Sequence, residues 1–220
     1  IGVAAVANQA RTPFITPTAT NSRITELGRY GFQANVDFEN LGRFLGKYCL
    51  EETNTKDLVT LSPRGDFGVE ITDAFSRTID KGGIKLLSQK WYSGTPENLG
   101  YHFKDFRKIA VEVAQKELQN KIKTMQDSLN TLMHQDSSWL VNAGFQVFPY
   151  DSTRYEVYHK EKMYLLKTQE VLTVTGLMDS SEFALPDPED FGEKISSIDA
   201  VFLPVKSENL EMIISQLDYY

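Results

Sequence analysis

Hydrophobic and polar positions follow two alternating periods over much of the chain. Short apolar runs, typical of buried strands, are followed by stretches in which apolar residues recur at spacings of three and four, typical of helices with one buried face. The expected strands are 14–16, 30–35, 57–61, 84–91 and 198–203, and the expected helices are 3–10, 38–48, 69–79 and 208–216. This alternation predicts an α/β fold, a parallel sheet with helices on both faces.

Local signals set several of these helix boundaries. Pro13 ends the first helix, because a proline disfavours helical geometry in the residue before it. Asp37 or Asn35 can cap the second helix, and Gly82-Gly83 is a helix C-cap signal that closes the third.

The pattern changes after residue 100. One long amphipathic helix is expected from Phe103 to about Met133, with the apolar stripe Phe106, Ile109, Val113, Ile122, Met125, Leu129 and Leu132. Such a stripe is most often the core-facing side of a helix, and a partner-binding or coiled-coil helix is the alternative. Further on, 156–158 and 163–166 fit strands or short helices. The β-branched stretch 170–175 is predicted to be a strand.

Charge and composition exclude some classes of function. The chain has 220 residues, a net charge of -7 and a pI near 5.1, which argue against a general nucleic-acid binder, since phosphate contacts need a basic surface. No apolar run is long enough to span a bilayer. The single cysteine, Cys49, is expected to be a buried small hydrophobe. The chain begins with Ile1 rather than Met, which is typical of an internal fragment of a longer protein.

No catalytic constellation is found in the sequence. His102, His134 and His159 are not at metal-ligand spacing from one another or from a cysteine or carboxylate. Nucleophile-elbow, P-loop and dinucleotide-binding motifs are absent. The sequence therefore predicts a protein that is not an enzyme and that uses neither a cofactor nor a metal.

Three loops carry the candidate chemistry. In an open α/β sheet, ligands bind outside the carboxyl ends of the strands. The loops in this position are 17–21, 62–68 and 204–207. Backbone amides and hydroxyl groups of the first can hold a carboxylate, and the helices that follow the other two add positive dipole ends.

The order and spacing of several motifs resemble a known family. Residues 7–21 include Pro13-Phe14-Ile15-Thr16-Pro17-Thr18-Ala19-Thr20-Asn21, and further matches lie at 30–35, 66–68, 94–95 with 105–106, and 199–204. Together they resemble the leucine/isoleucine/valine-binding (branched-chain amino-acid receptor) family, which has the type I periplasmic-binding-protein fold. The resemblance implies three-layer αβα lobes with a ligand held between two of them. It places 1–30 at the end of the first portion of lobe 1 and 31–110 in the lobe 2 core. An insertion then follows at 111–194, and the chain returns to lobe 2 at 195–220.

The resemblance also implies ligand-binding positions. Thr18, Ala19 and Thr20 match the loop that holds the ammonium and carboxylate of an amino-acid ligand, and Asp66 opens a lobe 2 helix. Two positions depart from the family, because Phe67 lacks the aromatic hydroxyl and Lys206 stands where an aromatic residue is expected. These departures weigh against amino-acid specificity.

Two functions from different classes remain open. The first is a periplasmic, extracytoplasmic or lipid-anchored receptor that binds a small polar ligand, such as an amino acid, for an ABC-type transporter or a sensor. The second is a ligand-free interaction protein of the same fold, like the lipoprotein activators of penicillin-binding proteins, which contacts an envelope partner through the insertion. Both exclude nucleic acid as a partner.

Overall fold

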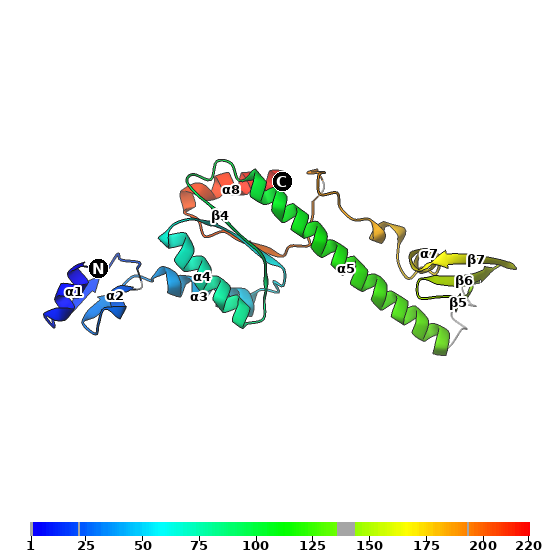
Figure 1. Cartoon of the computed structure of the whole chain (residues 1–220), viewed down its shortest axis with the longest axis horizontal. Helices are drawn as coiled ribbons and strands as arrows, with labels where there is room; N and C mark the ends of the chain where they lie inside the picture. The colour runs from blue at the N-terminus through cyan, green and yellow to red at the C-terminus, as the bar shows by residue number, and fades with distance from the viewer. Residues whose placement is uncertain (1, 22, 136–143, 193) are drawn as a thin grey trace. The chain divides into compact units, whose positions relative to one another are not determined.

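The computed structural model describes residues 2–21, 23–135, 144–192 and 194–220. They form two compact units, Ile1–Ile109 with Lys194–Tyr220 (unit 1) and Ala110–Glu193 (unit 2) (Figure 1). The elements of unit 1 are α1 (Gly2–Gln9), β1 (Phe14–Thr16), α2 (Arg23–Glu26), β2 (Gly31–Gln33), α3 (Phe38–Glu52), β3 (Leu58–Pro63), α4 (Asp66–Lys81), β4 (Leu86–Tyr92), β8 (Ala200–Phe202) and α8 (Ser207–Tyr219). Helix α5 (Gly100–Gln135) begins in unit 1 and continues in unit 2.

The main sheet of unit 1 is parallel, in the strand order β4-β3-β8. Leu58 of β3 pairs with Leu86 on one side and with Ala200 on the other. Because successive side chains of a strand point to opposite faces, a sheet covered on both sides needs continuous apolar strands. The residues of β3 from Leu58 to Ser62 are accordingly all buried.

Helices cover both faces of this sheet. One face carries Leu58 and Phe202, which form a core with Cys49 of α3 and Phe75 of α4. The rings of Phe75 and Phe202 stack with centroids 3.8 Å apart. The expected α/β fold with helices on both faces is confirmed, and Cys49 is buried as expected.

The opposite face is covered by the first part of α5 and by α8. Val59 and Leu61 of β3 form a core there with residues of both helices, namely Phe103, Phe106 and Ile213. The alternation of Leu58, Val59 and Leu61 between the two cores is the period of two that defines a strand. The sheet is thus the middle layer of an αβα sandwich.

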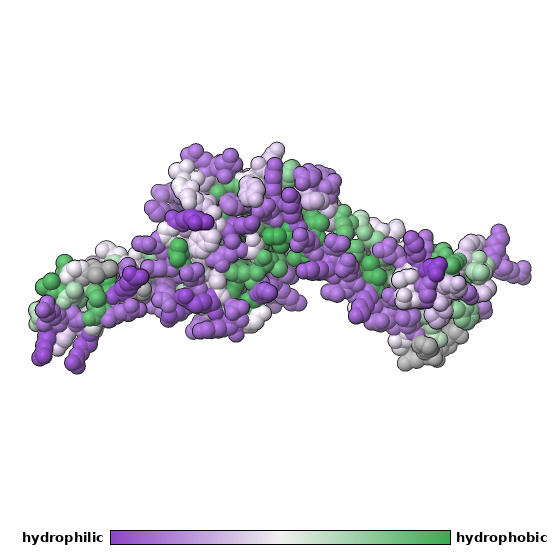
Figure 2. Space-filling view, viewed as in Figure 1, coloured by the Kyte–Doolittle hydropathy of each residue, from purple (hydrophilic) through white to green (hydrophobic). Residues whose placement is uncertain are grey.

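The amino-terminal segment of unit 1 is small. Strands β1 and β2 form a two-stranded parallel sheet, with Phe14 opposite Gly31 and Thr16 opposite Gln33. Val3 and Val6 of α1 are 79% and 66% exposed. Figure 2 accordingly shows hydrophobic residues at the surface over the segment that Figure 1 draws in dark blue.

Unit 2 is built on a three-stranded antiparallel sheet. Its elements besides α5 are β5 (Gln146–Pro149), β6 (Arg154–His159), β7 (Lys162–Lys167), α7 (Thr168–Val174) and the 3-10 helix η1 (Ser180–Phe183). The strand order is β5-β6-β7. The core joins Leu129 of α5 to Val147, Tyr155 and Val157 of the sheet and to Leu172 of α7. The apolar stripe of the long helix is therefore core-facing in unit 2.

One expected strand is wrong. Residues 170–175, predicted as β structure from their β-branched content, belong largely to the helix α7. Glu170 accepts a hydrogen bond from the Lys167 N–H at 2.7 Å, which satisfies one of the groups that a helix N-terminus leaves unpaired. Val171, Leu172 and Thr175 share the buried side at helical spacing. Tertiary packing and the helix cap outweigh the weak β propensity.

Some expectations fall outside what the structure describes. Residues 137–143 of the expected mixed segment are among them, and so are the side chains of Leu132 and His134. The stretches 156–158 and 163–166, left open between strand and helix, are strands. The assignment of units to lobes and to an insertion stays a prediction.

Candidate functional site

The loop that follows β1 is fixed by hydrogen bonds to residues of β1, β2 and α3. The Ala19 N–H donates to the Thr16 hydroxyl at 3.3 Å, and the side-chain amide of Gln33 donates to the Ala19 carbonyl at 2.8 Å. The Phe38 N–H donates to the Thr20 carbonyl at 3.3 Å. Thr18 is exposed, whereas Ala19 and Thr20 are half-buried. The loop thus has two fixed carbonyl groups and an exposed hydroxyl.

Gln33 was not predicted as a site residue. It lies on β2 directly opposite Thr16, the last residue of β1, so the register brings its side chain to the loop. Its Nε2 atom donates to Ala19, but its buried Oε1 atom has no hydrogen-bond partner among the described residues. A buried acceptor without a partner costs free energy unless a ligand or water satisfies it. Gln33 is therefore a candidate ligand contact beside the loop of Thr18, Ala19 and Thr20, which we call the threonine loop.

The beginning of α4 contacts the beginning of α3, which is hydrogen-bonded to the threonine loop. Phe67 packs edge-on against Phe38, with ring centroids 4.9 Å apart and an interplanar angle of 78°. Phe38 is the first residue of α3, and its N–H holds the Thr20 carbonyl. Asp37 caps α3 and accepts from the Asn40 N–H at 2.6 Å. The structure therefore connects Thr20 to Phe67 through Phe38.

Carboxylates gather at the beginnings of α3 and α4. Burial raises the pKa of Glu70, and the negative charges of Asp66, Asp37 and Glu39 raise it further, whereas the charge of Arg23 acts in the opposite direction. Glu70 is half-buried, and its Oε2 atom is buried without a hydrogen-bond partner among the described residues. The beginnings of α3 and α4 therefore carry a group of carboxylates in which a negative charge on Glu70 is unfavourable.

The other two predicted loops are arranged differently. The Arg64 N–H donates to the Tyr92 carbonyl at 2.7 Å, and the Ser62 and Thr72 hydroxyls are hydrogen-bonded at 2.7 Å, which ties the end of β3 to β4 and α4. Lys206 is the N-cap of α8, and its exposed ammonium lies 3.8 Å from a carboxylate oxygen of Glu208. Thr20 and Phe67 are thus connected through shared contacts, while Lys206 is engaged with its own helix.

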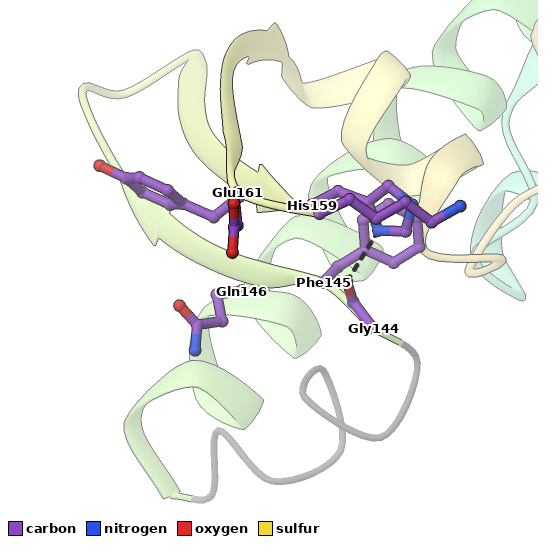
Figure 3. Close-up of a pocket in the computed structure, with 7 residues that line it drawn as sticks. Gly144, Phe145, Gln146, His159 and Glu161 are labelled. Atoms are coloured by element: carbon purple, nitrogen blue, oxygen red, sulfur yellow. Dashed lines mark hydrogen bonds between the residues drawn. The ribbon is translucent and has the colours of Figure 1, made fainter.

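A separate pocket lies in unit 2. It is lined by Gly144, Phe145, Gln146, Tyr158, His159, Lys160 and Glu161. In Figure 3 the His159 ring lies beside Phe145, and its Nδ1 atom is 2.8 Å from the Gly144 carbonyl. No predicted site residue belongs to this pocket.

Among the described residues, no group of three or more His, Cys, Asp or Glu side chains is placed to hold a metal ion. No helix in the same residues has both the length and the apolar content needed to cross a membrane.

Comparisons with known proteins gave matches only among solved structures. No protein-family model and no curated protein matches the chain. Part of the chain is similar to solute-binding proteins of ABC transporters. They include a substrate-binding protein from Desulfitobacterium hafniense in complex with leucine (21% identity, 50% of this chain, 30% of that chain, TM-score 0.39). A leucine-binding protein from Thermotoga maritima also matches (14% identity, 53% of this chain, 36% of that chain, TM-score 0.41). So does a branched-chain amino acid transporter protein from Rhodopseudomonas palustris (20% identity, 46% of this chain, 28% of that chain, TM-score 0.39).

The chain spans about 30% of the length of the first solved chains. The activity, ligand and partners of the whole protein are therefore proposals.

Proposed function

We propose that this chain is part of an extracytoplasmic solute-binding protein that holds a small polar ligand between two lobes for an ABC-type transporter or a sensor. The observation that carries the proposal is the contact of the Thr18–Thr20 loop with the first residues of α3, which in turn contact the beginning of α4. Backbone and hydroxyl groups of this loop suit a polar ligand, and ligands of open α/β sheets bind at the carboxyl ends of the strands.

The charges beside the loop favour a ligand that carries an ammonium group. Asp66 and Glu70 lie on the first turns of α4. The pKa of Glu70 is raised first by burial and then by the neighbouring carboxylates, and a cation bound there would offset the repulsion between these carboxylates. A carboxylate of the same ligand would be bound by the hydroxyl groups of Thr18 and Thr20. A zwitterionic small molecule such as an amino acid meets both requirements.

Ligand-dependent stabilisation of the full-length protein tests the proposal. A panel of amino acids and small organic acids should contain a ligand that raises the Tm, since binding to the native state alone stabilises it. The double variant Thr18→Val, Thr20→Val should lose that shift while its ligand-free Tm stays near the wild-type value. Thr12→Val, which changes an exposed hydroxyl before the same strand, serves as the matched control. An equal shift in both variants would contradict a role for the loop.

A ligand-free interaction protein is the second candidate. Phe67 offers no hydroxyl group to a ligand, and its ring is occupied by the contact with Phe38. The Lys206 ammonium is close to Glu208. Absence of any thermal shift, together with a partner that binds wild-type unit 2, would favour this candidate.

A further inference from the structure

Strand β7 is the edge of the unit 2 sheet in the described part of the chain. It pairs with β6 on one side only, and alternate N–H and C=O groups of an antiparallel edge strand point away from its neighbour. Its sequence is four apolar residues between Lys162 and Lys167. Met163, Tyr164 and Leu165 are 55%, 44% and 43% exposed. An edge strand of this kind can pair with another extended segment.

The outer face of the same sheet carries exposed apolar side chains among polar ones. Directly paired residues of an antiparallel sheet lie on one face, so Leu165, Glu156 and Phe148 form one cross-strand row, and Met163, Tyr158 and Gln146 form the next. Phe148 is 49% exposed, and its ring lies edge-on to Tyr158 at 5.9 Å. The opposite face, with Val147, Tyr155 and Val157, is buried against α5 and α7. A strand added beside β7 would extend the exposed rows as well as the backbone ladder.

Charge distinguishes between the segments that could be added. Lys162 pairs with His159 and Lys167 with Arg154, so the two lysines stand at the two ends of β7 and on opposite faces of the sheet. Like charges directly opposite each other destabilise a strand pair. Acidic residues at the same two positions of a partner strand would instead form cross-strand ion pairs. The edge therefore suits a partner strand that carries acidic residues at these two positions.

We propose that β7 and the adjoining outer face bind an extended, acidic segment of a partner protein, which pairs with β7 as a fourth strand. Main-chain hydrogen bonds to the β7 edge would supply affinity, as in other strand-addition complexes. Met163 and Leu165 would supply apolar contacts, and Lys162 and Lys167 would select for acidic residues. This site lies in unit 2 and is independent of the solute site proposed in unit 1.

Two synthetic hexapeptides test the charge selection on the full-length protein. Both alternate valine and threonine, and one has aspartate at each end whereas the other has lysine. Fluorescence anisotropy should show at least about tenfold tighter binding of the aspartate peptide, weakening as salt is added, because exposed ion pairs are screened. The double variant Lys162→Glu, Lys167→Glu should reverse the preference. Lys116→Glu, on an exposed position of α5, should leave it unchanged.

The mode of binding has its own test. An aspartate peptide with N-methylated backbone amides cannot pair as a strand and should lose binding, and Leu165→Thr should weaken binding of the unmodified peptide. The proposal is overturned by equal affinity for both peptides, by no binding of either, or by full retention of binding on N-methylation. Dimerisation of the wild-type protein through β7, or binding of phosphatidylglycerol vesicles in place of the peptide, would overturn it as well.

Discussion

Glu70 is held where its own charge is unfavourable. Its pKa is raised first by burial and then by the neighbouring carboxylates of Asp66, Asp37 and Glu39. A glutamate whose folded-state pKa lies above the unfolded value destabilises the native protein at pH values above both. As the pH falls through the folded pKa, the native protein binds a proton and this penalty disappears.

Replacing Glu70 should therefore separate stability from binding. Glu70→Gln should raise the Tm of the ligand-free protein slightly at pH 7, with a gain within about 0.5 kcal/mol, as expected for a surface change. The gain should vanish below the unfolded pKa of about 4.3, where both forms are neutral. If the proposed ligand carries an ammonium group, the same variant should bind it more weakly. Thermal unfolding as a function of pH and of ligand concentration measures both effects, and a gain that persists at pH 3 would contradict the electrostatic cause.

Gly42 determines how closely α3 approaches α4. A Cβ atom at this position would lie 2.3 Å from the Ile71 carbonyl oxygen and 2.9 Å from the Ala74 Cβ atom. Neither atom can move without shifting α4.

Gly42→Ala should consequently destabilise unit 1 by about 1–3 kcal/mol, the usual cost of overpacking, even though alanine is the better helix former. Denaturant unfolding of the full-length protein measures the change. Gly65→Ser is the matched control, because a Cβ there meets nothing within 4 Å and serine is a good N-cap residue. Equal stability of both variants would show that the helices can separate at no cost.

At the scale of elements, α5 has two different environments. Its first part packs against the parallel sheet through Phe103 and Phe106, and its second part contributes Leu129 to the unit 2 core. Periodicity alone predicted an apolar stripe but left open whether it faced a core or a partner. In the antiparallel sheet that covers the second part, the sequence of β6 and β7 did not distinguish strand from helix, and β5 was not predicted.

Leu129 is fully buried, so its truncation distinguishes the core interpretation from the partner-binding one. Leu129→Ala should cost about 2–5 kcal/mol, and amide hydrogens of β6 and α7 should exchange faster. Lys123→Ala, on the exposed side of the same helix, should change stability by less than about 0.5 kcal/mol. Unchanged exchange in Leu129→Ala would mean that the stripe is not core.

At the scale of the whole molecule, the sequence predicted the αβα layers and the long helix because each element has a strong hydrophobic period. It misassigned residues 170–175, where a helix cap and burial override β propensity. It also missed Gln33 and Glu70. Gln33 lies within the matched segment 30–35, but its contact with the threonine loop follows only from the register of β1 with β2. Glu70 lies one turn after Asp66 on α4, outside the matched segment 66–68. Contacts between distant segments are what local patterns do not contain.

The central claim is that the threonine loop belongs to a solute-binding site. Native mass spectrometry of the full-length protein, purified without denaturation, tests this claim most directly. We expect a fraction of the molecules to carry a bound small zwitterionic solute, and we expect that mass to be absent from the Thr18→Val, Thr20→Val variant. An empty wild-type protein that also fails to bind any member of an amino-acid panel would contradict the claim and leave the interaction-protein function in its place.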